Sequence, residues 1–249
     1  MTRKDGLWLS VALVVTWRAA AWSWPHPADS SPLPVQRMLG LLGLWFVGWG
    51  LWTWRRRPAP VTRLFAAYCL LSGLHWGGPV GAGGPQARAL LLGLYLLLSV
   101  TAACTFLHLA LVAGRRALSP VSRWVVYLPA IAATGLFLAI PLPLAGGRFA
   151  VEPMAYTIAP SVLWSFAGGF VWLRRFWRSD PRTRREQRLG WVVAALLVGY
   201  LPHGLASAGL LPLGDLEGLA NLSFALVPWA LASSLARPPG HPTSARAAP

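Results

Sequence analysis

Residues 89–114, ALLLGLYLLLSVTAACTFLHLALVAG, contain no charged side chain and are followed directly by Arg115 and Arg116. A helix of this length extends over roughly 39 Å, which exceeds the roughly 30 Å hydrocarbon core of a bilayer. Because lipid offers backbone amides no hydrogen-bond partners, a helix is the conformation that satisfies them along such a run. The stretch therefore predicts a membrane-spanning helix whose end the two arginines hold in the cytoplasm.

The composition agrees with this prediction. Of the 249 residues, 55% are hydrophobic and only 12% are charged, whereas a soluble domain carries about 25% charged residues. The net charge of +15 would suggest nucleic acid as the partner of a soluble protein, but here the arginines lie between apolar runs. We expect no nucleic-acid partner. Cys69 and Cys104 lie inside apolar runs, without the spacing of a disulfide framework or a metal site.

The other apolar runs extend the prediction to an all-α fold, a single polytopic transmembrane helix bundle of about eight spans. The expected spans are residues 6–24, 38–54, 61–76, 89–114, 124–144, 153–173, 189–213 and 218–236, followed by a short disordered cytoplasmic tail at 237–249. The first span is the weakest, because a basic start, an apolar centre and small residues are also typical of a cleaved signal peptide. Without it, seven spans remain in the same orientation.

The distribution of charge supports this topology. With both termini in the cytoplasm, the cytoplasmic segments hold 18 of the 22 Lys and Arg residues, as the positive-inside rule requires. The principal cytoplasmic loop is then RRFWRSDPRTRREQR, residues 174–188. We expect its arginines to contact a cytoplasmic partner protein or anionic lipid headgroups. They are Arg174, Arg175, Arg178, Arg182, Arg184, Arg185 and Arg188.

A few polar residues inside the spans are candidates for a ligand site. His75 and His203 lie at similar depth, about 20 Å from the cytoplasmic ends of their spans, so together they could line a ligand pocket or ligate haem or a metal. Histidines that only bond to neighbouring helices are the simpler alternative. The candidate ligand-binding residues are His75, His203, Trp164, Tyr200 and Asn221. Others that could line a cavity are Tyr68, Tyr95, Tyr127, Tyr156, Ser72, Ser165 and Ser223.

Signatures of catalysis are missing. The sequence has no P-loop, HExxH or GxSxG motif, and no segment between the spans is long enough for a catalytic domain. We therefore expect no enzyme activity, no resident cofactor and no metal site. The absence of Asp or Glu deep in any span disfavours ion-coupled transport. Two alternatives stay open: a haem- or metal-binding membrane enzyme subunit that uses His75 and His203, and a small-solute transporter.

Three patches carry a family resemblance. They are LLGLWFVGWGLWTWRRRPAPVTRLFAAYCLLSGL at 41–74, CTFLHLALVAGRR with SRWVVYLPAIAA at 104–116 and 122–133, and RTRREQRLGWVVAALLVGYLPHGL with NLSFALVPWALASSLAR at 182–205 and 221–237. Together they resemble the amino-terminal, seven-transmembrane-type sensor region of bacterial histidine kinases, although Ala113 and Gly114 stand where that family has Phe-Pro. No kinase domain follows in this sequence.

The resemblance implies a receptor-like sensory and signalling module in the bacterial inner (cytoplasmic) membrane. Such a module would pass a membrane or ligand signal to a separate cytoplasmic partner, and would not itself transfer phosphate. The oligomeric state is left open.

Overall fold

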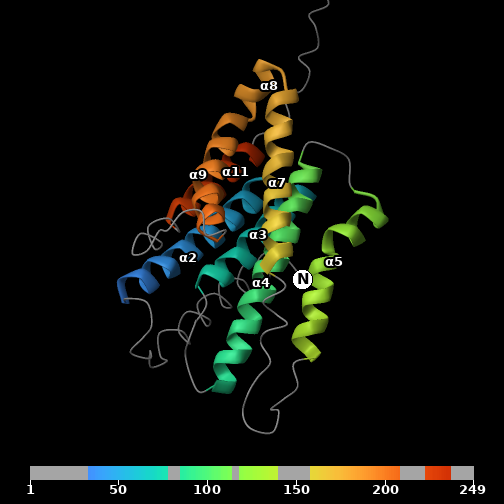
Figure 1. Ribbon diagram of the computed structural model, residues 1–249. Coiled ribbons are helices and arrows are strands. Elements are labelled where there is room, and N and C mark those ends of the chain that lie inside the picture. Colours follow the sequence, from blue (N-terminus) through green and yellow to red (C-terminus); the bar gives the residue numbers. More distant parts are fainter. Residues whose placement is uncertain (1–32, 78–84, 114–117, 140–157, 208–221, 237–249) are drawn as a thin grey trace, which may run out of the picture.

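The computed structural model describes residues 33–77, 85–113, 118–139, 158–207 and 222–236, and every element in these ranges is helical (Figure 1). The all-α prediction is confirmed for this part of the chain. The elements are α2 (Leu33–Arg56), α3 (Pro60–Gly77), α4 (Pro85–Val112), α5 (Pro120–Ala139), α7 (Ile158–Arg178), α8 (Pro181–Glu186), α9 (Leu189–Ser207), the short 3₁₀ helix η2 (Ser223–Ala225) and α11 (Leu226–Leu235). The predicted first span at 6–24 and the tail at 237–249 lie outside the described residues.

The helix bounds follow the sequence prediction most closely at α3 and differ most at α7. Helix α3 extends the predicted 61–76 by one residue at each end. Helix α7 instead continues to Arg178, so Arg174, Arg175 and Arg178 belong to a helix and not to the predicted loop. Arginine is a good helix former, and its long side chain can carry its charge away from an apolar surface. The positive charges at 174–178 therefore did not end the helix.

Six helices form a closed ring. Helix α2 packs against α3, α3 against α4, α4 against α7, α7 against α9 and α9 against α11, and α11 returns to α2. Helix α5 packs on α4 from outside this ring and lies at the edge of the molecule (Figure 1). The short α8 lies beyond the end of α7, where it connects α7 to α9 (Figure 1).

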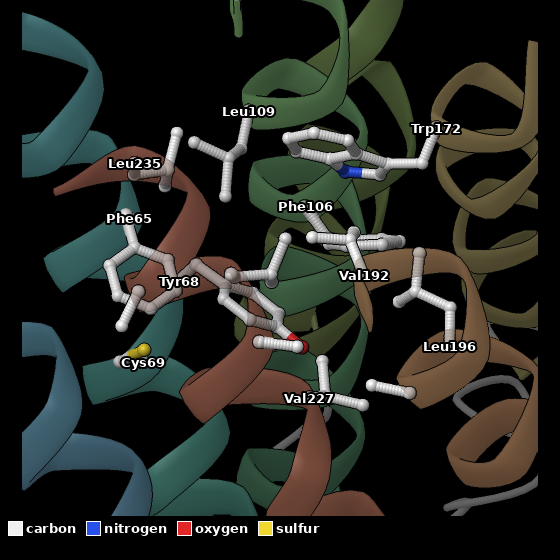
Figure 2. Close-up of a cluster of buried hydrophobic side chains, with 14 of the residues drawn as sticks. Phe65, Tyr68, Cys69, Phe106, Leu109, Trp172, Val192, Leu196, Val227 and Leu235 are labelled. Carbon is white, nitrogen blue, oxygen red and sulfur yellow. The ribbon is translucent and has the colours of Figure 1, made fainter. Parts of the chain in front are cut away.

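Aromatic and aliphatic side chains fill the centre of the ring. Phe65, Phe106, Leu109 and Trp172 are at most 1% exposed and come from α3, α4 and α7 (Figure 2). Small polar residues are also buried; in the described helices these are Thr53, Thr62, Ser72, Thr105, Ser161 and Ser234. Threonines 53 and 105 each donate from the hydroxyl to the backbone carbonyl four residues earlier, so these polar groups are satisfied within their own helices.

Large apolar side chains, in contrast, cover much of the outside. On α5 the exposed ones follow helical spacing: Val121, Trp124, Val125, Leu128, Ile131, Leu136 and Leu138. Among the described helices, two are long and apolar enough to cross a membrane by length and composition, Leu91–Val112 and Pro120–Leu138. The most apolar stretch of the second is only 17% buried. Two further apolar helices, Leu189–Pro202 and Ser223–Leu235, are shorter.

Candidate functional site

A cavity of about 250 Å³ lies between the first half of α7 and the facing part of α4, and α3, α9 and η2 complete its walls. We call it the α4–α7 cavity. Its α7 residues lie between Ile158 and Phe166, whereas α8 follows the other end of α7, so the cavity lies toward the end of the bundle opposite α8. The lining residues are Tyr68, Ser72, His75, Trp76, Tyr95, Leu96, Ser99, Ala102, Ala103, Ile158, Ser161, Val162, Ser165, Phe166, Tyr200 and Phe224. None of them is an acid, a lysine or an arginine.

Two pairs of hydroxyl groups join the helices around this cavity. The Tyr68 and Tyr200 hydroxyl oxygens are 3.0 Å apart and connect α3 to α9, while Ser99 Oγ and Ser161 Oγ are 2.9 Å apart and connect α4 to α7. In a pair of hydroxyls one donates to the other, and the acceptor keeps its own hydrogen. The serine pair has no further hydrogen-bond partner among the described residues, so it presents one O–H donor beside the cavity.

His75 lies in the last turn of α3 and is held by Tyr95 of α4. Its Nδ1 is 3.3 Å from the Tyr95 carbonyl oxygen, and its ring stacks on the Tyr95 ring with centroids 4.0 Å apart. Because a carbonyl oxygen only accepts, this hydrogen bond places the proton on Nδ1 and leaves Nε2 as an acceptor in the neutral ring. The imidazole is thus oriented by a neighbouring helix.

The structure brings together part of the predicted ligand site. His75 and Tyr200 both line the α4–α7 cavity. Trp164 does not, since its Nε1 donates to the Val126 carbonyl oxygen at 2.8 Å and so fastens α5 to α7. The side chain of His203 and the whole of Asn221 lie outside the described part of the chain. The pairing of His75 with His203 in haem or metal ligation therefore stays a prediction.

The sequence prediction missed Ser99 and Ser161, which form the serine pair. A signal was present, because both are polar residues inside otherwise apolar runs. Spacing alone could not reveal that these two serines face each other, since they are 62 positions apart in the chain. His108, which also lies inside a span, bonds through Nδ1 to the Tyr127 hydroxyl at 3.1 Å and joins α4 to α5, away from the cavity.

Residues 174–188, which we call the basic hairpin, form a compact structure rather than an open loop. Of its seven arginines, Arg174, Arg175 and Arg178 lie at the end of α7, Arg182, Arg184 and Arg185 in α8, and Arg188 in the turn before α9. Arg188 closes the hairpin with a positive backbone angle, φ 50°. The arginines predicted to contact a partner therefore differ in their contacts within the hairpin.

Arg175 and Arg184 hold the basic hairpin together. Arg175 donates to the carbonyl oxygen of Ala113 at the end of α4, and its Nη2 donates to Gln187 Oε1 at 2.6 Å. Arg184 donates from Nε to the Ser179 carbonyl at 2.8 Å and from Nη2 to the Trp177 carbonyl at 3.0 Å. Both side chains therefore satisfy backbone carbonyls near the ends of helices.

Asp180 begins α8. Its carboxylate accepts hydrogen bonds from the Thr183 amide at 2.9 Å and from the Thr183 hydroxyl at 2.7 Å, and Pro181 occupies the first position of the helix. These bonds, that of the amide first, lower the pKa of the Asp180 carboxyl below its ordinary value. The acid therefore stays ionised at neutral pH and is committed to the cap.

The described residues contain no group of three or more His, Cys, Asp or Glu side chains that could hold a metal ion. Cys69 and Cys104 are buried with free thiols. The site that this part of the chain provides is thus an uncharged, hydroxyl- and aromatic-lined cavity.

Within the described ranges the chain is all-helical, and two of these helices are long and apolar enough to cross a membrane by length and composition. Comparisons of the chain with protein-family models, with curated proteins and with solved structures found no match.

Proposed function

We propose that this protein is a receptor-like sensory module of the bacterial inner membrane, a polytopic bundle that binds a small uncharged molecule in the α4–α7 cavity. Binding alters the packing of α7 against α9, and the basic hairpin passes this change to a separate cytoplasmic protein. One observation carries the proposal: the two helices that contribute Ser161, Ser165 and Tyr200 to the cavity are the helices that the basic hairpin connects. The role is that of the kinase sensor region which the three sequence patches resemble.

The exposed face of α5 supports lipid as the surrounding solvent. A long apolar helix in a soluble protein is normally buried, and a signal sequence lies near the amino terminus, but α5 is neither of these. Leu128 and Leu138 are 62% and 77% exposed. Such a continuous apolar surface would be a liability in water and is the expected lipid-facing surface of a membrane helix.

The chemistry of the cavity supports a small, uncharged ligand. A charged ligand held away from water needs an opposite charge, and the lining provides none. The hydroxyls of the serine pair can hydrogen-bond to a carbonyl, hydroxyl or amide group. Aromatic rings from Trp76, Phe166 and Phe224 provide apolar contact around them.

The packing between the α4–α7 cavity and the α8 end of the bundle favours ligand binding over transport. Toward α8 the ring is filled by Phe106, Leu109 and Trp172, each at most 1% exposed (Figure 2). A solute that entered the α4–α7 cavity would have to displace this layer in order to cross. Because interiors this densely packed resist gradual deformation, a closed end suits a site that senses occupancy.

A continuous helix connects the cavity to the basic hairpin. Ser165 and Arg178 both belong to α7 and are separated by about 20 Å at the rise of an α-helix. Arg175 lies between them and fixes this end of α7 to the end of α4 and to Gln187. A shift or rotation of α7 at the cavity must therefore change these contacts of the hairpin.

The proposal is tested by filling the cavity and observing the hairpin. A nitroxide is attached at Arg182→Cys, whose side chain is 81% exposed, in the full chain with Cys69→Ala and Cys104→Ala. We expect Ser165→Phe, which adds a ring to the cavity wall, to change the mobility of the nitroxide in the electron paramagnetic resonance spectrum. Tyr200→Phe, which removes one hydroxyl at nearly constant volume, should change it in the same sense but less.

Leu163→Phe is the matched control. It adds a ring to the same helix on a face that is 61% exposed and does not line the cavity. Its spectrum should equal that of the parent protein. Identical spectra for Ser165→Phe, Tyr200→Phe and the parent, with all three chains folded by thermal unfolding, would refute the coupling of cavity and hairpin.

A further inference from the structure

The basic hairpin contains a second recess, separate from the α4–α7 cavity. It is an open cleft of about 630 Å³ lined by Phe176, Arg184, Arg185, Arg188, Gly190 and Trp191. We propose that this cleft binds the phosphate group of an anionic phospholipid, held by Arg184, Arg185 and Arg188, with Trp191 against the adjoining glycerol and acyl region.

No acid of the hairpin neutralises these three arginines. Asp180 is committed to the amide and hydroxyl of Thr183, and Glu186 Oε1 lies 3.7 Å from Arg182 Nε, outside the cleft. The Arg185 and Arg188 side chains have no hydrogen-bond or ion-pair partner among the described residues. Three guanidinium groups around one open cleft repel one another, and an anion between them relieves this repulsion. Phosphate is the anion whose geometry fits several guanidinium groups at once.

Arg184 is already held in place for such a ligand. Its Nε and Nη2 donate to the carbonyl oxygens of Ser179 and Trp177, and its guanidinium carbon lies 4.9 Å from the centroid of the Phe176 ring. These contacts fix the plane of the group and leave Nη1 without a partner in the described part of the chain. A preoriented donor binds with a smaller loss of conformational freedom.

Arg188 occupies a backbone conformation that favours glycine. Its φ of 50° places a long side chain in the left-handed region, which non-glycine residues adopt at a cost. An arginine at position 188 is consistent with a role for its guanidinium rather than for its backbone.

The position of the cleft selects a lipid over a soluble phosphate. It lies where α7 ends and α9 begins, and Trp191 beside it is 59% exposed. Exposed tryptophans at the ends of membrane helices sit at the level of the lipid headgroups. A headgroup phosphate at this level reaches the arginines while its acyl chains stay alongside α9.

The test measures the thermal unfolding of the purified full chain in a neutral detergent, at 150 mM NaCl, with increasing dioleoyl-phosphatidylglycerol. We expect the anionic lipid to raise Tm, and dioleoyl-phosphatidylcholine to raise it much less. Arg185→Gln together with Arg188→Gln should weaken the apparent affinity for the anionic lipid about 25-fold, since each arginine near a lipid surface contributes about a fivefold factor.

A charge-matched variant separates the cleft from general surface charge. Arg178→Gln with Arg182→Gln removes the same two charges from the same hairpin at positions that do not line the cleft. It should weaken the affinity clearly less than the Arg185 and Arg188 double variant does, because neither Arg178 nor Arg182 lines the cleft. Equal weakening by both double variants would overturn the proposal.

Arg188→Gly separates binding from folding. Glycine tolerates a positive φ, so this variant should have an unchanged or higher Tm without lipid and yet lose most of the lipid response. A retained lipid response would exclude Arg188 as a ligand. If inorganic phosphate raised Tm as much as the anionic lipid and abolished the lipid effect, the ligand would be a soluble phosphate and the lipid assignment would be wrong.

This inference rests on the proposed function only in placing the hairpin at a membrane surface. The lipid titration uses purified protein and needs no movement of α7. It can therefore fail while the coupling between cavity and hairpin holds, and it can succeed while that coupling is absent.

Discussion

At the scale of single residues, two glycines let α2 and α3 approach closely. A Cβ atom added to Gly43 of α2 would lie 2.5 Å from the carbonyl oxygen of Gly73 in α3, and one added to Gly73 would lie 2.7 Å from the Gly43 carbonyl oxygen. Small residues let membrane helices approach until their backbones touch, and the resulting van der Waals contact stabilises the pair. The interface between α2 and α3 therefore depends on the absence of a side chain at these two positions.

Gly43→Ala should destabilise the bundle by about 1–3 kcal/mol, the usual range for overpacking a tight contact. The obstacle is backbone, which cannot rotate away. Gly48→Ala is the matched control on the same helix, because a Cβ at Gly48 has open space, and alanine is the better helix former. Thermal unfolding in the same detergent compares the Tm values of the two variants. Equal Tm values would show that the close approach of α2 and α3 does not contribute to stability.

The candidate site shows what sequence reasoning at this scale provides. The similar depth of His75 and His203 predicts that these histidines line a ligand pocket, and Tyr200 is a further candidate for the lining. The structure places His75 and Tyr200 in the α4–α7 cavity, but it assigns Trp164 to the contact with α5. Which hydroxyl faces which depends on helix rotation, and the Ser99–Ser161 pair is therefore visible only in the folded chain.

At the scale of helices, hydropathy located the long elements, but α2 and α5 begin earlier than predicted, α7 ends later, and α8 lies within the predicted loop. The apolar run at 61–76 is bounded by a basic turn and by glycines, so α3 was predicted almost to the residue. In α7 the charge pattern predicts that a loop starts at Arg174, yet the helix continues through Arg178. The guanidinium of Arg175 donates to the Ala113 carbonyl and to Gln187, and these contacts stabilise the end of the helix. A hydropathy pattern does not show such contacts to other parts of the chain.

Helix α5 gives the sharpest test of the surrounding solvent. Leu128 lies near its middle and is 62% exposed. In water, Leu128→Arg at such a site would change stability by no more than about 0.5 kcal/mol. In a bilayer, an arginine at the centre of a helix costs about 2.5–3.5 kcal/mol on insertion scales.

We therefore expect Leu128→Arg to reduce insertion of this segment strongly, as measured by the fraction integrated into membranes. Trp124→Arg is the control, because Trp124 is 69% exposed but lies next to Arg123 near the start of the helix. There an arginine side chain can extend to the headgroups, and its cost is smaller. Unchanged insertion for both variants would argue that α5 does not cross lipid.

At the scale of the whole molecule, the ring of six helices was beyond sequence reasoning. Hydropathy predicts that helices exist, but the order α2, α3, α4, α7, α9, α11 around the ring, with α5 outside, depends on which faces are complementary. The glycines of α2 and α3 and the hydroxyl pairs supply part of that complementarity. Helix α4 joins α5 to this ring and contacts α3, α5 and α7. It contains residues 89–112 of the apolar run from which the membrane prediction began.

The orientation of the bundle is the last prediction, and two positions on α7 test it. This helix has 21 residues, a length of about 31 Å that matches the hydrocarbon core, and its ends differ in charge: Ile158 begins it, and Arg175 and Arg178 lie in its last turn. In the chain with Cys69→Ala and Cys104→Ala, Ile158→Cys should react with a membrane-impermeant maleimide in intact spheroplasts. Arg182→Cys should react only after lysis, because the positive-inside rule retains the seven arginines of the basic hairpin in the cytoplasm. Labelling of Arg182→Cys in intact spheroplasts, with Ile158→Cys protected, would reverse the bundle and separate the hairpin from any cytoplasmic partner.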